Sequence, residues 1–90
     1  MQTQTTFSAL GASGNVVLPS DAAHDILRRM NYGNGDSTAS GGQFIGRLHS
    51  AMYVASADRS PTGTIRLVRM KRLHTLANRV QGLGQQVTWS

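Results

Sequence analysis

An apolar stripe between Pro19 and Gly33 constrains the fold of this chain more than any other feature. Its members recur at the i, i+3, i+4 and i+7 positions of a helix: Ala23, Ile26, Leu27 and Met30. Pro19 ends an extended segment, Ser20 is a suitable N-cap, and Gly33 can terminate a helix. We therefore expect a helix over residues 20–31 that buries this stripe in the core.

Short segments that favour β-structure lie near both ends of the chain. Residues 5–10 and 15–18 surround the sequence GASG, which suits the turn of a hairpin. Residues 85–89, QQVTW, predict a final strand. We expect these strands to join in one small sheet.

A second helix is predicted after the Gly-rich loop 31–42. Ser40 and Gln43 have the spacing of a capping box, which marks a helix start. Apolar residues then recur on one side of this helix: Phe44, Ile45, Leu48, Met52 and Ala55. The segment Asp58-Arg59-Ser60-Pro61 is expected to end it.

The predicted elements indicate an α+β fold with about three helices in a small single domain over residues 1–90. Residues 1–19 form a β-rich N-terminal segment, and residues 20–57 form two helices joined by a Gly-rich loop. Residues 64–90 contain a basic strand or helix and the C-terminal strand. Strands from the two ends of the chain are expected to pair with each other.

Residues 64–80 are the most basic part of the chain and allow two interpretations. As one helix, they would place Arg66 and Arg69 on the same face as Met70 and Leu73, which is unfavourable unless that face is an interface. We therefore expect a strand over 64–68 and a helix from about residue 70 to about 81. The alternative is a kinked helix that begins at Ser60-Pro61, since Ser followed by Pro is a good helix start.

The charge of the chain indicates an anionic partner. The formal net charge is +5, and five of the nine Lys and Arg residues lie between residues 64 and 80 without an acidic residue among them. We expect nucleic acid first, with an acidic protein surface or a nucleotide as other candidates. The predicted phosphate contacts are Arg66, Arg69, Lys71, Arg72 and Arg79, extended by Arg28, Arg29 and Arg47. The candidates for stacking on a base are Tyr32, Tyr53 and Trp89.

No pattern in the chain predicts catalysis. The acidic residues are four aspartates, and Asp25 is better explained by pairing with Arg28 or Arg29 one turn later in the first helix. No local signature such as G-x-S-x-G supports a nucleophile. The segment GNGDSTASGG lacks the G-K-[ST] of a P-loop, so it is interpreted as a connector. We expect a protein that is not an enzyme and has no cofactor.

Three histidines recur at a spacing of 25 residues, two of them in the repeated sequences RLHS and RLHT. They are His24, His49 and His74. No two of them form a local ligand pair such as that of H-E-x-x-H, and the absence of cysteine excludes Cys-ligated zinc. We therefore predict no metal site.

One segment resembles the ribbon–helix–helix plan of dimeric DNA-binding repressors. NVVLPSDAAHDIL followed by SGGQFIGRLHSAM gives strand, Leu-Pro, helix, turn and helix over residues 15–57. The resemblance implies strand side chains that enter the major groove. Only Asn15 is polar in the candidate strand, the connector is longer than the short turn of that family, and residues 66–79 have no counterpart. No functional residue is therefore carried over.

Size and composition predict self-association and a cytoplasmic location. Ninety residues with five aromatic side chains give a thin core, which a second copy would supplement, most simply as a symmetric dimer. No apolar run approaches the roughly 20 residues that cross a bilayer, and the N-terminus lacks the features of a secretory signal. Two alternative functions stay open. One is an inhibitor or adaptor of the kind that phages and mobile elements encode, which occludes a protein machine or sequesters a nucleotide. The other is a small structural subunit of an assembly.

Overall fold

Strands from both ends of the chain form one sheet in the computed structural model, which describes residues 3–9, 15–33, 35–81 and 86–90. The elements in chain order are β1 (Gln4–Ala9), β2 (Val16–Pro19), α1 (Ser20–Arg29), β3 (Thr38–Ser40), α2 (Gly41–Ala55), α3 (Pro61–Gln81) and β4 (Gln86–Trp89). The strand order is β2-β1-β4-β3, and every pair is antiparallel. The predicted α+β fold, with a sheet built from N-terminal and C-terminal strands, is confirmed.

The alternation of side chains along the strands directs one face of the sheet to the core. On β1, Thr5, Phe7 and Ala9 are buried, and Phe7 lies opposite Val16 of β2 and Trp89 of β4. The other face carries exposed or half-buried side chains that are almost all uncharged and polar: Gln4, Thr6, Ser8, Val17, Thr38, Ser40, Gln86 and Thr88. All charged residues that the structure describes therefore lie outside the strands.

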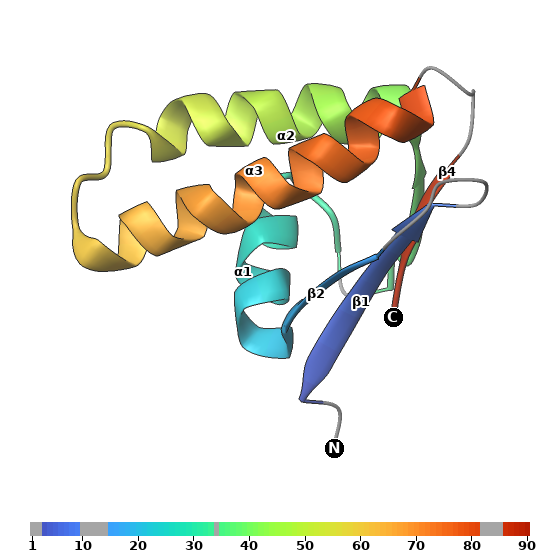
Figure 1. The fold of residues 1–90 in the computed structure, drawn as a ribbon, viewed down its shortest axis with the longest axis horizontal. Helices are drawn as coiled ribbons and strands as arrows, with labels where there is room; N and C mark the ends of the chain where they lie inside the picture. The colour runs from blue at the N-terminus through green and yellow to red at the C-terminus, as the bar shows by residue number, and fades with distance from the viewer. Residues whose placement is uncertain (1–2, 10–14, 34, 82–85) are drawn as a thin grey trace.

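The helices cover the buried face of the sheet (Figure 1). An aromatic group fills the centre of the core, with ring centroids 5.2–6.4 Å apart among Phe7, Tyr32, Phe44 and Trp89. α2 and α3 form an antiparallel hairpin, and their connected ends extend away from the sheet past α1 (Figure 1). Only part of the hairpin is therefore supported by the sheet.

α1 confirms the predicted core stripe but differs at both ends. Ile26, Leu27 and Met30 are all buried. The N-cap position is Pro19, and Ser20 is already helical, with its hydroxyl bonded to Thr5 Oγ1 at 3.1 Å. The chain leaves the helix through Asn31, whose φ of 67° is left-handed, two residues before the glycine that was expected to end the helix.

α2 begins where the capping box placed it. The backbone N–H of Gln43 donates to Ser40 Oγ at 3.2 Å. The Gln43 side chain does not complete the box; its Oε1 accepts instead from the Tyr32 hydroxyl at 3.4 Å. In the preceding loop, Thr38–Ser40 forms β3 and pairs with β4, a strand that the sequence analysis did not predict.

α3 corrects the preferred interpretation of residues 64–80. The strand expected over 64–68 is wrong, because Pro61–Gln81 is one helix that begins at Pro61 as the alternative had it. Ser60 Oγ accepts from the Gly63 backbone N–H at 3.1 Å, which satisfies a free amide of the first turn. The helix tolerates Arg66 on its inner side because acidic residues from elsewhere in the chain meet it there.

The ribbon–helix–helix resemblance does not extend to the fold. β2 pairs with β1 of the same chain in a hairpin, as predicted for residues 5–10 and 15–18, although the turn itself lies outside the described residues. α1 and α2 are separated by β3, which joins the sheet. The strand that would enter a groove in that family is here an edge of a four-stranded sheet.

Candidate anion-binding surface

The structure separates the eight predicted cations by what they contact. Arg29, Arg47 and Arg66 are held by partners within the protein. No hydrogen bond or ion pair within the described part of the chain engages Arg28, Arg69, Lys71 or Arg72. Arg79 is exposed near the C-terminal end of α3.

Arg66 connects three parts of the fold and is not available as a phosphate contact. Its Nε lies 2.8 Å from Asp25 Oδ2 in α1, and a terminal nitrogen lies 3.5 Å from Asp58 Oδ2 in the α2–α3 connection. Its side chain is only 14% exposed. Binding a phosphate would require this half-buried guanidinium to leave both carboxylates, so the structure gives Arg66 a structural role.

Asp25 is the centre of this ion-pair network. Besides Arg66, it accepts from Arg29 Nε at 3.3 Å, one turn along α1. Partial burial by itself raises the pKa of Asp25, but the hydrogen bonds from Arg66 and Arg29 outweigh it and hold the pKa below its ordinary value. The predicted pairing with Arg28 or Arg29 is thus confirmed for Arg29.

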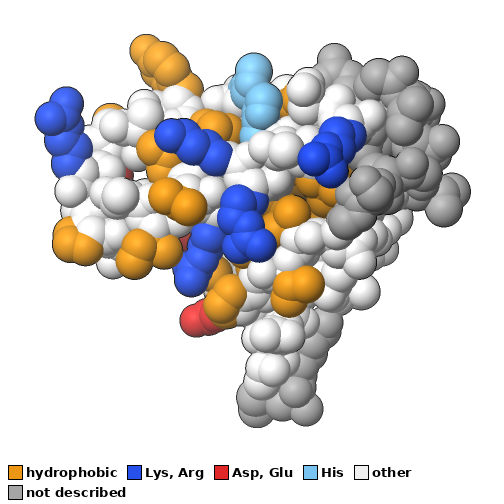
Figure 2. Space-filling model, viewed as in Figure 1, with side chains coloured by type: hydrophobic (Ala, Val, Ile, Leu, Met, Phe, Trp, Pro, Cys, Tyr) orange, Lys and Arg blue, Asp and Glu red, His pale blue; other side chains and the backbone are white. Residues whose placement is uncertain are grey.

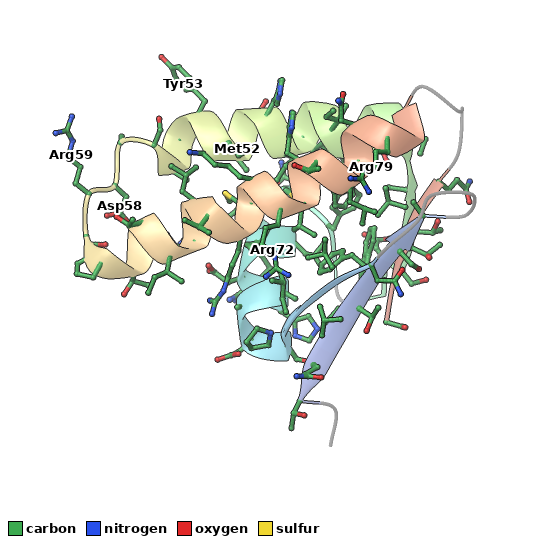
Figure 3. All side chains as sticks on the ribbon, viewed as in Figure 1. Met52, Tyr53, Asp58, Arg59, Arg72 and Arg79 are labelled. Carbon is green, nitrogen blue, oxygen red and sulfur yellow. The ribbon has the colours of Figure 1, made fainter. Side chains whose placement is uncertain are left out.

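Asp58 is positioned by the start of α3. Its carboxylate accepts from the Ser60 backbone N–H at 3.0 Å. That bond, then a bond from the Ser60 side chain and the nearby charge of Arg66, lower the pKa of Asp58. Figure 3 shows Asp58 in the α2–α3 connection, directed toward the first turn of α3.

Arg47 and two of the three stacking candidates belong to the core and its edge. The Arg47 guanidinium lies 4.6 Å from the centre of the Tyr32 ring and donates to the Asn31 carbonyl at 3.3 Å. Tyr32 and Trp89 are each 6% exposed, so their rings are engaged in the core and leave little surface on which a base could stack. Burial also raises the pKa of the Tyr32 hydroxyl. Tyr53 is 83% exposed on α2, so stacking of a base on Tyr53 stays a prediction.

The remaining cations follow the solvent side of α3, and we call Arg69, Lys71, Arg72 and Arg79 the α3 basic face. Lys71, Arg72 and Arg79 are exposed, and Arg69 is half-buried. Figure 2 shows basic side chains distributed along α3, and Figure 3 labels Arg72 and Arg79 on this helix. α3 contains no acidic residue. Ile65 and Val68, about half exposed, lie on the same helix.

Two of the grooves that border basic residues also contain acidic side chains, which disfavour an anion. One of them, of about 350 Å³ between α1 and α3, is lined by Arg66 and Arg69 but also by Asp21 and Asp25, whose carboxylates repel an anion. Arg28 lines another groove, of about 260 Å³, with His24, Asp36 and the loop after α1. Arg28 is therefore not part of the α3 basic face.

Two of the three regularly spaced histidines meet in the structure. His49 of α2 and His74 of α3 have their Nε2 atoms 2.6 Å apart. The repeat of RLHS and RLHT marks both histidines in the sequence, but they meet because α2 and α3 pack side by side. His24 lies on α1 and lines the groove of Arg28. No cluster of three or more metal-ligating side chains is present among the described residues.

Comparisons with protein families, curated proteins and solved structures gave no match. Among the described residues, no helix is both long and apolar enough to cross a bilayer. The function is therefore inferred from the surface geometry of the chain itself.

Proposed function

We propose that this protein binds nucleic acid without catalysing a reaction, through the α3 basic face, and acts as a small regulatory binding protein. One observation carries the proposal: α3 contains no acidic residue, and within the described part of the chain no hydrogen bond or ion pair engages its cations Arg69, Lys71 and Arg72. Cations arranged in this way neutralise phosphates and release the counterions condensed on a nucleic acid. A cytoplasmic location is part of this proposal.

The spacing of the cations favours a polyanion over a single small anion. Arg72 and Arg79 are seven residues apart, so they lie on one ridge of α3, separated by about two turns or 10 Å. Arg69 and Arg79 are about 15 Å apart along the helix axis. A mononucleotide reaches one or two of these residues, whereas successive phosphates of a strand can meet all of them.

The first test is the salt dependence of binding to duplex DNA. Each phosphate contact contributes about −0.9 to the slope of log affinity against log salt concentration, so Arg69→Ala with Arg72→Ala should make the slope shallower by nearly two units. The matched control is Arg28→Ala with Arg59→Ala, which removes the same charge from exposed positions outside α3. This control should leave the slope nearly unchanged.

Two results would contradict the proposal. One is a wild-type protein with no measurable affinity for duplex or single-stranded nucleic acid near physiological salt. The other is an equal change of slope in the α3 pair and the control pair, because binding would then follow net charge and not the α3 basic face. Circular dichroism of every variant separates loss of binding from loss of fold.

The alternative proposal is an inhibitor or adaptor that docks on an acidic protein surface, and one observation favours it. Large apolar side chains are exposed near the connected ends of α2 and α3: Tyr53 at 83%, Val54 at 67%, Ile65 at 52% and Val68 at 55%. Figure 3 shows Tyr53 directed away from the hairpin. Phosphate binding does not require such side chains, whereas protein interfaces are enriched in them. If nucleic acid does not bind, this function takes first place.

A further inference from the structure

His49 and His74 are convergent nitrogen ligands on two adjacent helices. Their Nε2 atoms are 2.6 Å apart, while the ring centroids are 4.6 Å apart and the ring planes differ by 3°. Because the nitrogens are so much closer than the centroids, the two rings meet at their Nε2 edges and not face to face. His49 is exposed and His74 is half-buried.

This contact requires uncharged imidazole. Two nitrogens at 2.6 Å share one proton, so one ring donates and the other accepts, and the acceptor must be neutral. Burial first, and the neighbouring His49 second, lower the pKa of His74. A neutral imidazole nitrogen at the surface is also the form of histidine that binds a metal ion.

We propose that His49 and His74 form a two-imidazole site for a divalent transition metal such as Zn²⁺, Ni²⁺ or Cu²⁺. Metal–nitrogen distances of about 2.0–2.1 Å place two imidazole nitrogens on one ion when they are roughly 3 Å apart. The rings therefore need only a small rotation, in which the ion replaces the shared proton. Imidazole suits these metals, whereas Mg²⁺ and Ca²⁺ prefer oxygen ligands.

The site is open on its outer side. Figure 2 shows the histidine side chains projecting at the surface above α3. Two nitrogens leave at least two coordination positions to water, since His24 is on α1 and lines a different groove. The expected affinity order follows the general preference of nitrogen sites, with Cu²⁺ above Ni²⁺ and Zn²⁺.

Titration of each metal salt into the protein near neutral pH tests the site. Removing even a hydrogen-bond partner of a ligand lowers metal affinity about 10–100-fold, so His49→Gln and His74→Gln should each lower it by at least about tenfold. The matched control is His24→Gln, which removes the third histidine and should leave the affinity unchanged. Lowering the pH should weaken binding, because protons compete for the same nitrogens.

Imidazole ¹⁵N NMR keeps the test decisive if a variant is less stable. Zn²⁺ should shift the Nε2 resonances of His49 and His74 in the wild-type protein and leave those of His24 in place. Equal shifts at all three histidines, or undiminished affinity in the His49→Gln protein, would overturn the proposal. The site is independent of the α3 basic face, so Arg69→Ala with Arg72→Ala should bind the metal like wild type.

Discussion

At the scale of single residues, Arg66 shows that the role of a cation is decided by what surrounds it. It is one of five basic residues in a stretch without acids, but Asp25 and Asp58 reach it from 41 and 8 positions away in the chain. A guanidinium with 14% exposure is stable there because both of its neighbours are carboxylates. Arg72, with no such neighbour and six residues later, stays available to solvent and ligands.

Asp25→Asn should destabilise the protein by about 1–3 kcal/mol near neutral pH, because the half-buried Arg66 loses its closest charged partner. The pKa of Asp25 is held below its ordinary value in the folded protein, so the stabilisation from its charge is present near neutral pH and is lost as the pH falls through the folded-state pKa. Urea unfolding of both proteins should therefore differ near pH 7 and converge in strong acid. Asp21→Asn, in the same helix but without an ion pair, is the control. A difference that persists unchanged in acid would contradict the role of the carboxylate charge.

At the scale of elements, the connection between α2 and α3 sets where α3 begins. Gly63 is buried in the first turn of α3, and a Cβ there would overlap the Asp58 carboxylate. Gly46, on the exposed side of α2, has no neighbouring atom within 4 Å of an added Cβ. Two helical glycines in one hairpin thus have opposite expected responses to the same substitution.

Gly63→Ala should lower the free energy of unfolding, because Asp58 must leave its bonds with Ser60 and Arg66. Gly46→Ala should raise it by about 0.5–1 kcal/mol, since alanine restricts the unfolded chain and meets no obstacle in the helix. Thermal melts of the two variants beside wild type measure both signs. If the Gly63→Ala protein is as stable as the Gly46→Ala protein, the position of Asp58 beside Gly63 does not contribute to stability.

At the scale of the whole molecule, the edges of the sheet and the α2–α3 hairpin differ in how much surface they offer for contact with another chain. The edge strands β2 and β3 have four and three residues, and β2 ends in a proline, so both are poor templates for pairing with another chain. The connected ends of α2 and α3 instead carry the exposed Tyr53, Val54, Ile65 and Val68. We propose that self-association, if it follows apolar surface, uses these helices and not the sheet edges.

Sedimentation equilibrium tests this proposal. Wild type should form a dimer at tens of micromolar, and Tyr53→Ser with Ile65→Ser should shift it toward monomer, because both side chains are removed from exposed positions. Val17→Ser, an exposed apolar position on the edge strand β2, is the control and should leave the dimer intact. A wild-type monomer at these concentrations, or a dimer lost only in the Val17→Ser protein, would contradict the proposal.

Local patterns in the sequence determined much of this protein. The stripe of α1, the Ser40 cap of α2, the N-terminal hairpin and the strand near the C-terminus each depend on residues close together in the chain, so their periodicity and caps could be recognised. The fold class followed because strands at both ends must pair to satisfy their backbone groups. The exposed cations of α3 were also identified in advance, as members of a larger set.

Only the tertiary structure decided the features that depend on distant partners. β3 exists because β4 pairs with it, and α3 continues through Arg66 because Asp25 and Asp58 neutralise that charge. Tyr32 and Trp89 are in the core because the sheet and α2 enclose them, and His49 meets His74 because α2 and α3 pack side by side. The physical reason is common to all of these: burial and neutralisation depend on which side chains meet in space, and local periodicity carries no information about residues 25 or 41 positions away.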